Sequence, residues 1–394
     1  MSGRTGPLDG VLVADFSRVV AGPFATMLLG DLGADVVKVE RPGAGDDTRG
    51  FGPPFVEGES SYYLSVNRNK RSVAWDLGTE EGRRKGRKLA ERADVIVENF
   101  RPGTAARFGL GYEEIAEANP GVVYCSVSGF GSAGAGASLP GYDFLVQGVG
   151  GLMSVTGDDG GEPRKVGVAV VDVLTAQFAT NAIVAALYER ERSGRGQRVE
   201  VNLLSCLLSA LINQASTYVT TGTVPRAMGN RHPSIAPYET LQAADRLLVV
   251  AVANDAQFAA FAGALGLSWM ADDARFARNA ERVAHREEML SVLQAELHHR
   301  PAAEWLSVIQ AAGIPCGIVN DIAQAFELAE ALGLEPVVRL PRSGEAHPAP
   351  AAEPSGESQV RNPMGFSRTP ISYRLAPPAL GEHTAAVETE LDLA

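Results

Sequence analysis

The sequence predicts an α/β protein, with an open and mainly parallel sheet in its first part and a smaller α/β region further along. Three observations lead to this prediction. Strand and helix patterns alternate as far as Ser128, the texture becomes helical from Asp172, and a new strand at Leu247 is followed by helical patterns. At 394 residues the chain also exceeds the ~250–300 residues at which single cores stop growing, so two domains are expected.

The first repeat is a strand, a helix and a second strand. Val11–Asp15 is a short apolar run typical of a buried strand, and Phe24–Leu32 has apolar residues at helical spacing. Asp35–Glu40 is the next strand. Together they form a βαβ unit, whose two strands pair in parallel with a right-handed crossover.

The same alternation continues along the chain. We expect a strand at Ser72–Leu77, a charged helix at Glu80–Arg92, and strands at Asp94–Glu98 and Val122–Ser128. This order of elements predicts an open α/β sheet.

Helical patterns dominate after this sheet. Val173–Arg192 and Leu203–Thr221 are long helix candidates, separated by a turn at Ser193–Gln197.

A second compact region opens with a strand at Leu247–Ala253. Helices are expected at Asp255–Leu265, Arg286–His299 and Ala302–Ala312, which gives a smaller α/β domain. Pro341–Ser358 is rich in Pro, Ala, Gly, Ser and Glu without a period, so we expect a surface loop there.

Composition excludes several classes of function. The formal net charge of -12 argues against a nucleic-acid or anionic-membrane surface, which needs an excess of Lys and Arg. The charge is uneven: residues 1–110 carry +1 and the remainder -13, so a polyanionic small molecule is expected to bind the first third. The three cysteines are far apart, so neither a metal site nor a disulfide framework is indicated: Cys125, Cys206 and Cys316.

The N-terminal residues lack a basic stretch followed by an apolar one, and we see no run near the ~18 apolar residues of a membrane span. We therefore expect a cytoplasmic protein that does not enter a membrane. The chain also lacks G-x-x-x-x-G-K-[ST], H-E-x-x-H and G-x-S-x-G, and we see no G-x-G-x-x-G between a strand and a helix. The common ATP, dinucleotide, zinc-protease and serine-hydrolase motifs are therefore not indicated.

Clusters of Gly, Pro and basic residues lie at or beside the ends of the expected strands, where open α/β sheets bind ligands. Singly, each reads as a solvated turn; together they describe a basic crevice suited to phosphates, with Trp75 and Phe100 available to face an adenine. The clusters are Ala21–Pro23, Glu40–Gly43, Gly45–Arg49, Asn67–Ser72 and Glu98–Gly103.

Asp172 is the only charge in the apolar run from Val166 to Leu174, and it stands where a helix is expected to begin. It suits a helix N-cap. It also suits a reactive carboxylate, because a helix N-terminus stabilises the anion while partial burial raises its pKa. The two roles are compatible.

A series of motifs resembles the family III CoA transferases of the CaiB/BaiF type, which include formyl-CoA transferase and the α-methylacyl-CoA racemases. The order and spacing match over nearly the whole chain. The matching segments are Pro7–Gly10, Asp15–Pro23, Leu32–Pro42, Asn69–Ser72, Ala93–Gly103, Ser126–Gly131, Gly194–Gln197, Gly313–Gly317 and Leu380–Thr384.

The resemblance implies a Rossmann-like large domain with a smaller α/β domain, in an interlocked, ring-like homodimer. It places the large CoA-binding domain at 1–200, a linking helix at 201–224, the small domain at 225–325, and a C-terminal segment returning to the large domain at 326–394. Coenzyme A or acyl-CoA is then a substrate, small carboxylic acids are the other partners, and no metal or tightly bound cofactor is expected.

The resemblance also assigns residues by position. Asp172 matches the nucleophilic aspartate. Val19 and Val20 match residues that lie near the thioester. Arg41 and Arg107 match arginines that contact CoA. Asn99, Phe100 and Arg101 match the segment that lines the nucleotide.

Differences from formyl-CoA transferase and from the racemases restrict the substrates and the reaction that we expect. Val20 stands where formyl-CoA transferase has Gln, and Ala251–Asp255 lacks its glycine-rich loop, so a larger dicarboxylic or hydrophobic acid fits better than formate or oxalate. Tyr142 stands where the racemases have a catalytic His. A phenol of ordinary pKa near 10 is a poor acid–base catalyst for racemisation, which favours transfer.

We therefore expect CoA transfer through a mixed anhydride and an aspartyl-CoA thioester, with backbone N–H groups of Val19–Gly22 stabilising the oxyanions. Succinyl-CoA is the expected donor, because related transferases often use it. An α-methylacyl-CoA racemase and a noncatalytic CoA-binding paralogue are the alternatives. His232 is open to two interpretations, a substrate contact and a loop cap.

Overall fold

The structure, a computed structural model, describes residues 6–340 and 357–393. These residues form two compact units. The first contains residues up to Leu152, Val166–Thr221 and the chain from Glu335 onward, and the second contains Met153–Lys165 and Gly222–Leu334. The expected boundaries differ in three places. Met153–Lys165 was assigned to the large domain, residues 222–224 to the linking helix and residues 326–334 to the C-terminal segment, whereas all three belong to the second unit.

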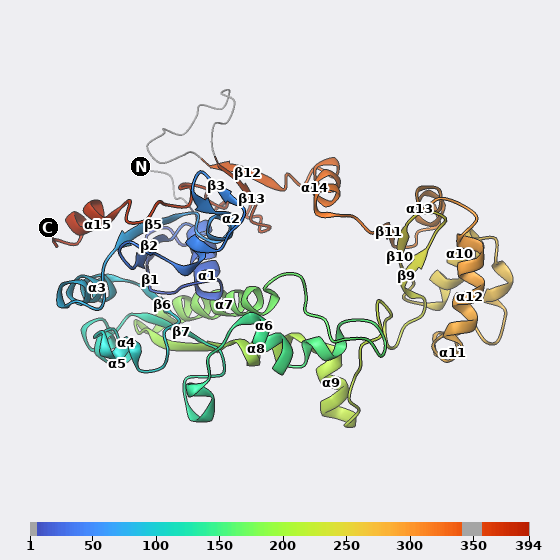
Figure 1. Ribbon diagram of the computed structural model, residues 1–394, viewed down its shortest axis with the longest axis horizontal. Coiled ribbons are helices and arrows are strands. Elements are labelled where there is room, and N and C mark those ends of the chain that lie inside the picture. Colours follow the sequence, from blue (N-terminus) through green and yellow to red (C-terminus); the bar gives the residue numbers. More distant parts are fainter. Residues whose placement is uncertain (1–5, 341–356, 394) are drawn as a thin grey trace. The chain divides into compact units, whose positions relative to one another are not determined.

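The first unit is built on a six-stranded parallel sheet (Figure 1). Counted along the chain, its strands lie in the order 3-2-1-4-5-6, which is the Rossmann order. The expected open α/β sheet is therefore confirmed. From edge to edge the strands are β5 (Lys70–Ala74), β2 (Asp35–Glu40), β1 (Leu12–Asp15), β6 (Val95–Glu98), β7 (Val123–Ser128) and β8 (Gln197–Asn202).

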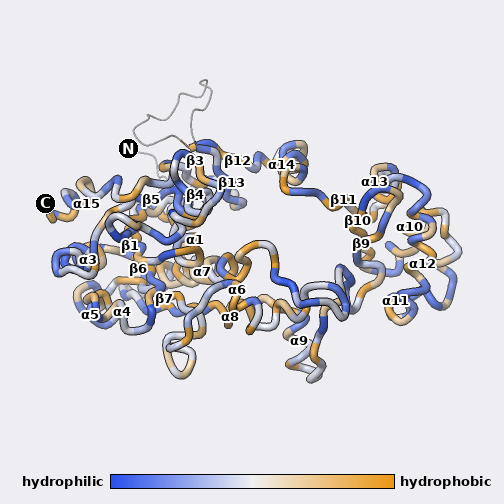
Figure 2. The backbone as a smooth tube through the Cα atoms, in the orientation of Figure 1, coloured by the Kyte–Doolittle hydropathy of each residue, from blue (hydrophilic) through white to orange (hydrophobic). Residues whose placement is uncertain are grey.

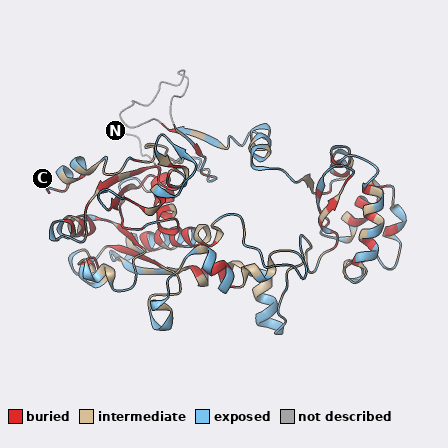
Figure 3. Ribbon diagram, in the orientation of Figure 1, coloured by how far each residue is buried: buried red, intermediate tan, exposed pale blue. Residues whose placement is uncertain are grey.

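Helices cover both faces of this sheet. Val13 belongs to the core that includes α1 and α7, whereas its neighbour Ala14 belongs to the core that includes α3, α5 and α15. Adjacent strand residues point to opposite faces, so burial of both faces explains the continuous apolar runs (Figure 3). The helices are α1 (Ala21–Asp31), α2 (Ser61–Leu64), α3 (Glu80–Arg92), α4 (Thr104–Arg107), α5 (Tyr112–Ala118), α6 (Asp143–Val149), α7 (Val170–Ser193), α8 (Leu203–Ala210), α9 (Ile212–Thr221) and α15 (Thr384–Glu390).

Short elements complete this unit. They are the antiparallel strand pairs β3 (Phe55–Val56) with β4 (Glu59–Ser60) and β12 (Val337–Leu340) with β13 (Glu357–Val360), and the 3₁₀ turns η1 (Asp47–Gly50) and η2 (Gly134–Ser138). A third 3₁₀ turn, η3 (Leu152–Val155), begins at Leu152 and otherwise belongs to the second unit. Most of the loop predicted at Pro341–Ser358 lies outside the described residues. Its last two residues open β13, so the prediction is wrong at that end.

The expected elements are otherwise present with shifted ends, and two differences change the architecture. Strand β8 was not predicted; its alternating residues Arg198, Val199 and Glu200 suit an edge strand with one face partly exposed. The single helix predicted at Leu203–Thr221 is two helices, α8 and α9, with a bend of 84°.

Helix α7 is the one described helix that is long and apolar enough to span a membrane, and α8 with α9 would qualify only as one bent span (Figure 2). The expectation that no run approaches this length was therefore wrong. Only part of α7 is buried: Ala176, Ala179 and Ile183 pack in the core beneath the sheet, while Phe178 and Tyr188 are exposed.

The second unit contains an antiparallel three-stranded sheet covered by helices, as the smaller α/β domain predicts. Its core includes Phe258, Phe261 and Trp305. The strands lie in the order β11 (Cys316–Ile318), β10 (Leu247–Ala251), β9 (Tyr238–Gln242), and the helices are α10 (Asp255–Ala264), η4 (Ser268–Ala271), α11 (Asn279–Ala284), α12 (Arg286–Leu297), α13 (Ala302–Ala311) and α14 (Ile322–Ala331).

Candidate active site

Two turns meet at the switch point of the parallel sheet. Strands β1 and β6 are neighbours there, and the chain continues from them in opposite directions across the sheet, which is where open α/β sheets bind ligands. Asn99, directly after β6, holds the turn after β1. Its Oδ1 accepts the Arg18 N–H at 2.9 Å and its Nδ2 donates to the Arg18 carbonyl at 2.8 Å. The two turns therefore form one rigid edge.

A cavity of about 400 Å³ opens at this edge, and we call it the Asp172 cavity. Six of the residues assigned from the sequence line it. These are Val19, Val20, Asn99, Phe100, Arg101 and Asp172. Tyr142, the residue that distinguishes this chain from the racemases, also lines it. The turns after β1 and β6 and the start of α7 are thus brought together although they are far apart in the sequence.

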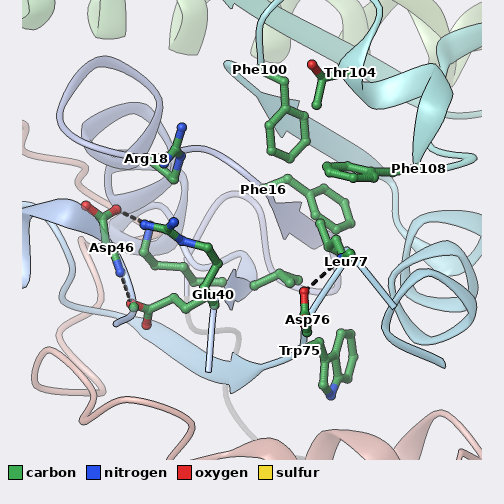
Figure 4. A pocket seen from close by; sticks show the side chains of 15 residues that line it. Phe16, Arg18, Glu40, Asp46, Trp75, Asp76, Leu77, Phe100, Thr104 and Phe108 are labelled. Carbon is green, nitrogen blue, oxygen red and sulfur yellow. Dashed lines mark hydrogen bonds and ion pairs between the residues drawn. The ribbon is translucent and has the colours of Figure 1, made fainter. Parts of the chain in front are cut away.

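A second cavity of about 330 Å³ lies beside the first, and we call it the aromatic cavity. Phe16, Phe100 and Phe108 point toward one another in it (Figure 4). The rings of Phe100 and Phe108 meet edge to face, with centroids 5.7 Å apart. Arg18 and Phe100 line both cavities, which makes the two adjacent.

The remaining predicted ligand residues divide between this cavity and its surroundings. Arg41 and Trp75 line the aromatic cavity. Trp75 is nearly buried, and its indole Nε1 donates to Glu388 of α15 at 2.9 Å. Arg107 lines neither cavity. Its guanidinium contacts the Thr104 hydroxyl at 3.2 Å, and Thr104 is the lining residue.

The positive charge of the crevice comes from fewer residues than the sequence suggested. Arg18 and Arg41 are partly exposed and both pair with Asp47, at 3.0 and 3.2 Å. The cluster Asn67–Ser72 does not contribute, because its cations are held in structural ion pairs. Lys70, for example, is fully buried against Asp15.

The sequence suggested that Asp172 is the N-cap of its helix, and this prediction is wrong. Helix α7 begins at Val170, two residues earlier, and the flanking Ala169 has no capping side chain. Asp143, the first residue of α6, caps the helix from outside. Its Oδ1 accepts the N–H of Val171 at 2.8 Å and that of Asp172 at 3.3 Å.

A buried glutamine supports this cap. Gln147 has no exposed surface, and its Nε2 donates to Asp143 Oδ2 at 2.6 Å. Its Oε1 accepts the N–H of Val166 at 2.9 Å, on the segment that leads into α7. Because Gln147 holds both the capping residue and this segment, it fixes the start of the helix that carries Asp172.

The environment raises the pKa of Asp172 to about 7. The larger cause is burial, which disfavours the charged carboxylate, and the second is the negative charge of Asp143. Burial raises the pKa of the Tyr62 phenol in α2, and the charges of Asp172 and Asp143 raise it further. Sequence reasoning missed Asp143, Gln147 and Tyr62, and only Asp143, which opens a helix beside Tyr142, offered a local signal.

The turn after β1 corrects the expected set of oxyanion donors. The Val19 N–H is directed to Asp46 and lies 3.3 Å from each of its carboxylate oxygens, so it is already occupied. Val20, Ala21 and Gly22 remain, at the N-terminus of α1, where the first N–H groups have no intrahelical acceptor. Of these three, Val20 and Ala21 line the Asp172 cavity and Gly22 does not.

His232 belongs to the second unit and acts there as a loop cap. Its Nδ1 accepts the Ser234 N–H at 3.1 Å, and its ring packs on Tyr238. Within the described ranges, no group of three or more His, Cys, Asp or Glu side chains is arranged to hold a metal ion.

Comparison with known proteins shows to which family the chain is similar. Residues 8–384 match the model of CoA-transferase family III. The chain is 42% identical to the succinate–glutarate CoA-transferase of Agrobacterium fabrum, covering 100% of this chain and 97% of that protein. It is 39% identical to the succinyl-CoA:glutarate CoA-transferase of Homo sapiens, over 98% of this chain and 86% of the other.

A solved structure agrees with these relatives. The CAIB/BAIF family protein from Brucella suis superposes with a TM-score of 0.86 at 40% identity, over 98% of this chain and 100% of that one. The match covers both units, and the resemblance seen in the motifs is confirmed. The chain belongs to CoA-transferase family III, and it is a CoA transferase.

Proposed function

We propose that this enzyme moves CoA from succinyl-CoA to a dicarboxylic acid such as glutarate. The donor and acceptor are taken from the names of the relatives, which include glutarate transferases from a bacterium and from mammals. The small side chain of Val20 in the Asp172 cavity is consistent with an acyl group larger than formyl. The observation that carries the proposal is a single carboxyl group, that of Asp172, with a raised pKa in a cavity that adjoins an aromatic one.

The two adjacent cavities match the two ends of acyl-CoA. The aromatic cavity offers rings for the adenine and Arg18 and Arg41 for phosphates. The shared residues Arg18 and Phe100 mark the path of the pantetheine arm toward Asp172. This layout delivers the thioester to the start of α7, where Asp172 lies.

The reaction then proceeds through covalent intermediates on Asp172. Its carboxylate attacks the thioester carbonyl, the carbon–sulfur bond breaks, and a mixed anhydride and CoA thiolate form. The thiolate attacks the aspartyl carbonyl and releases the donor acid, which leaves an aspartyl-CoA thioester. The acceptor carboxylate attacks that thioester to give a new anhydride, and the thiolate takes the acceptor acyl group, which restores the Asp172 carboxylate.

The surroundings of Asp172 favour each acylation. The burial and the Asp143 charge that raise its pKa act against the ionised carboxylate. They do not act against an anhydride or a thioester, which carries no charge at this position. The environment that raises the free energy of the ionised carboxylate therefore makes it a stronger nucleophile. It also stabilises the acylated forms of Asp172 relative to the free carboxylate.

The experiment is to trap the intermediate. The enzyme is incubated with succinyl-CoA, quenched with hydroxylamine or borohydride, and digested for peptide mass analysis. We expect modification of Asp172 alone, dependent on succinyl-CoA. Modification of Asp143 or Glu98 instead would contradict the assignment. Exchange measured with a panel of acyl-CoAs and free acids then identifies the acid pair.

We also propose that the enzyme works as a homodimer in the cytoplasm, without a membrane partner. The exposed apolar residues of α7 support the dimer, because a helix that is apolar on both sides is normally covered on both sides. Sedimentation velocity of the purified protein tests it, with a mass of twice 41.5 kDa expected. A monomer at micromolar concentration would contradict the proposal.

A further inference from the structure

Buried charges lie beneath the turn that connects β1 to α1. Asp15, Lys38 and Lys70 have no exposed surface, and Asp46 is 1% exposed. They form two ion pairs, Asp15 with Lys70 at 3.1 Å and Lys38 with Asp46 at 2.9 Å. Replacing a buried ion pair by apolar residues is often neutral or stabilising, so stability alone does not account for such a group.

Each of these ions holds a backbone atom of the turn. The Ser17 N–H donates to Asp15 at 2.9 Å, and Lys38 Nζ donates to the Ser17 carbonyl at 2.9 Å. Further along, Lys70 Nζ donates to the carbonyl of Pro23 at 2.8 Å. The turn is therefore fixed at its beginning and at its end, inside the first turn of α1.

Asp46 holds the middle of the turn. Its two carboxylate oxygens each lie 3.3 Å from the nitrogen of Val19. Asp46 is itself held: its own N–H donates to Glu40 Oε2 at 2.9 Å (Figure 4), and its Oδ1 accepts the N–H of Thr48 at 2.9 Å. The surrounding charges and hydrogen bonds keep the pKa of Asp46 well below its usual value despite burial, so it remains ionised in the working range of pH.

Val19 has a backbone conformation that needs such support. Its φ of 70° lies in the left-handed region, where a β-branched side chain is strained. Residues of this kind persist where their surroundings over-determine them, and they gather at active sites. Here the strained residue comes directly before Val20, the N-cap of α1, and Ala21, its first residue, and both line the Asp172 cavity.

We propose that Asp46 is a positioning residue for the transfer reaction: held by Lys38, it fixes the left-handed Val19 peptide and thereby directs the N-terminus of α1 toward the acyl carbon attacked by Asp172. This role rests on the proposed function, because it requires the acyl group to react in this cavity. Asp46 also lines the aromatic cavity, but the role proposed here is not a contact with the nucleotide. Its effect on the rate passes through Val19.

The test compares three variants of the full-length enzyme with succinyl-CoA and glutarate as substrates. Asp46→Asn keeps the shape of the side chain but removes its charge. We expect kcat to fall by about 100-fold, because a small misplacement of groups at the reacting centre has an effect of this size on the rate. The KM for succinyl-CoA should change less than about threefold. Circular dichroism and thermal unfolding confirm that the variant is folded.

Asp31→Asn is the matched control. Asp31 is equally buried, ends the same helix α1, and pairs with Arg68 at 2.6 Å, but it lines neither cavity. This variant loses a buried charge at the far end of the helix whose start Asp46 is proposed to direct. It is therefore expected to lower stability while kcat per folded enzyme stays within about twofold.

The third variant combines Asp46→Asn with Val19→Gly. Glycine adopts a φ of 70° without steric cost, so the turn can keep its conformation at residue 19 without the hydrogen bonds to Asp46. We expect the double variant to regain about tenfold in kcat over Asp46→Asn. It also provides a folded variant for comparison should Asp46→Asn alone fail to fold.

The outcomes separate the two proposals. If wild-type enzyme shows the succinyl-CoA-dependent adduct on Asp172 but Asp46→Asn retains full kcat, or Asp31→Asn loses as much as Asp46→Asn, or Val19→Gly gives no recovery, the role of Asp46 is refuted while the proposed function stands. If the wild-type enzyme shows no adduct on Asp172, the proposed function fails and the role of Asp46 fails with it.

Discussion

Asp143 caps the helix that carries Asp172, and one of the two N–H groups that it accepts is that of Asp172 itself, at 3.3 Å. The same contact brings a second negative charge to the reactive carboxyl. Asp143 therefore has two opposed effects on Asp172: it holds the backbone in place, and it makes the ionised side chain more costly.

The pH dependence of transfer follows from the pKa of Asp172, about 7. Only the ionised carboxylate attacks the thioester. We expect kcat/KM to rise about tenfold per pH unit below pH 7 and to level off above it. A rate independent of pH between 5 and 8 would contradict this assignment.

Asp143→Asn tests the second cause of the raised pKa. Removing the neighbouring charge favours ionisation, so the rising limb of kcat/KM should move to lower pH. The movement should be partial, because burial is the larger cause. Glu117→Gln, at an exposed position of α5, is the control and should leave the profile unchanged. An unmoved limb in Asp143→Asn would show that the two carboxylates are not coupled.

Asp172→Asn is expected to abolish exchange and to stabilise the fold at alkaline pH. The folded state binds the Asp172 proton more tightly than the unfolded state, so wild-type stability falls as pH rises from about 4 through about 7. At pH 8 the variant avoids this cost and should be more stable by on the order of 1 kcal/mol, with no such gain at pH 4. Exchange should drop by roughly 10⁴-fold or more while CoA still binds.

Denaturant unfolding at the two pH values measures the stability, and equilibrium binding of CoA measures the retained site. A variant that is less stable than wild type at both pH values would mean that the Asp172 carboxylate is stabilising, against the direction of its pKa.

Gln147→Leu removes the support beneath Asp143. Leucine fills a similar volume but leaves Asp143 Oδ2 and the Val166 N–H without the partner they have in the wild type. The variant should lose about 1–3 kcal/mol of unfolding free energy. Because the start of α7 is loosened, kcat should also fall, by about tenfold, with little change in KM. Gln147→Glu, which keeps the acceptor but adds a charge beside Asp143, should in addition move the rising limb of the pH profile to higher pH.

The sequence allowed much of this to be predicted, and the exceptions have physical reasons. Apolar periodicity located β1, α1 and β2 because both faces of the sheet are buried. The break between α8 and α9 lies within an apolar run and left no such signal. The motifs located Asp172, but Gln147 looks like an ordinary polar helix residue until its burial is known.

Charges were the hardest to predict from sequence. Lys70 lies in the cluster Asn67–Ser72, which was interpreted as basic and solvated, and Lys38 lies in the expected strand Asp35–Glu40. Both are fully buried in ion pairs. A residue's exposure depends on which partners the fold brings to it, and these partners, Asp46 and Asp15, come from other segments. The strained φ of Val19 likewise follows from contacts across the chain and not from its neighbours in sequence.

The aromatic cavity gives the last prediction, which concerns the nucleotide end of the substrate. Arg41 lines this cavity and not the Asp172 cavity, and its side chain is 57% exposed. Arg41→Ala should therefore raise the KM for succinyl-CoA by about 5- to 10-fold at low salt, leave kcat unchanged, and weaken the dependence of KM on salt.

A truncated substrate makes this prediction specific. Succinyl-pantetheine lacks the nucleotide, so its KM should be the same for Arg41→Ala and for wild type. Arg87→Ala removes a comparably exposed arginine that pairs with Glu91 on α3 and lines neither cavity, and it should behave as wild type with both substrates. If Arg41→Ala changed KM for succinyl-pantetheine as much as for succinyl-CoA, Arg41 would act on the thioester end, and the aromatic cavity would not be the nucleotide site.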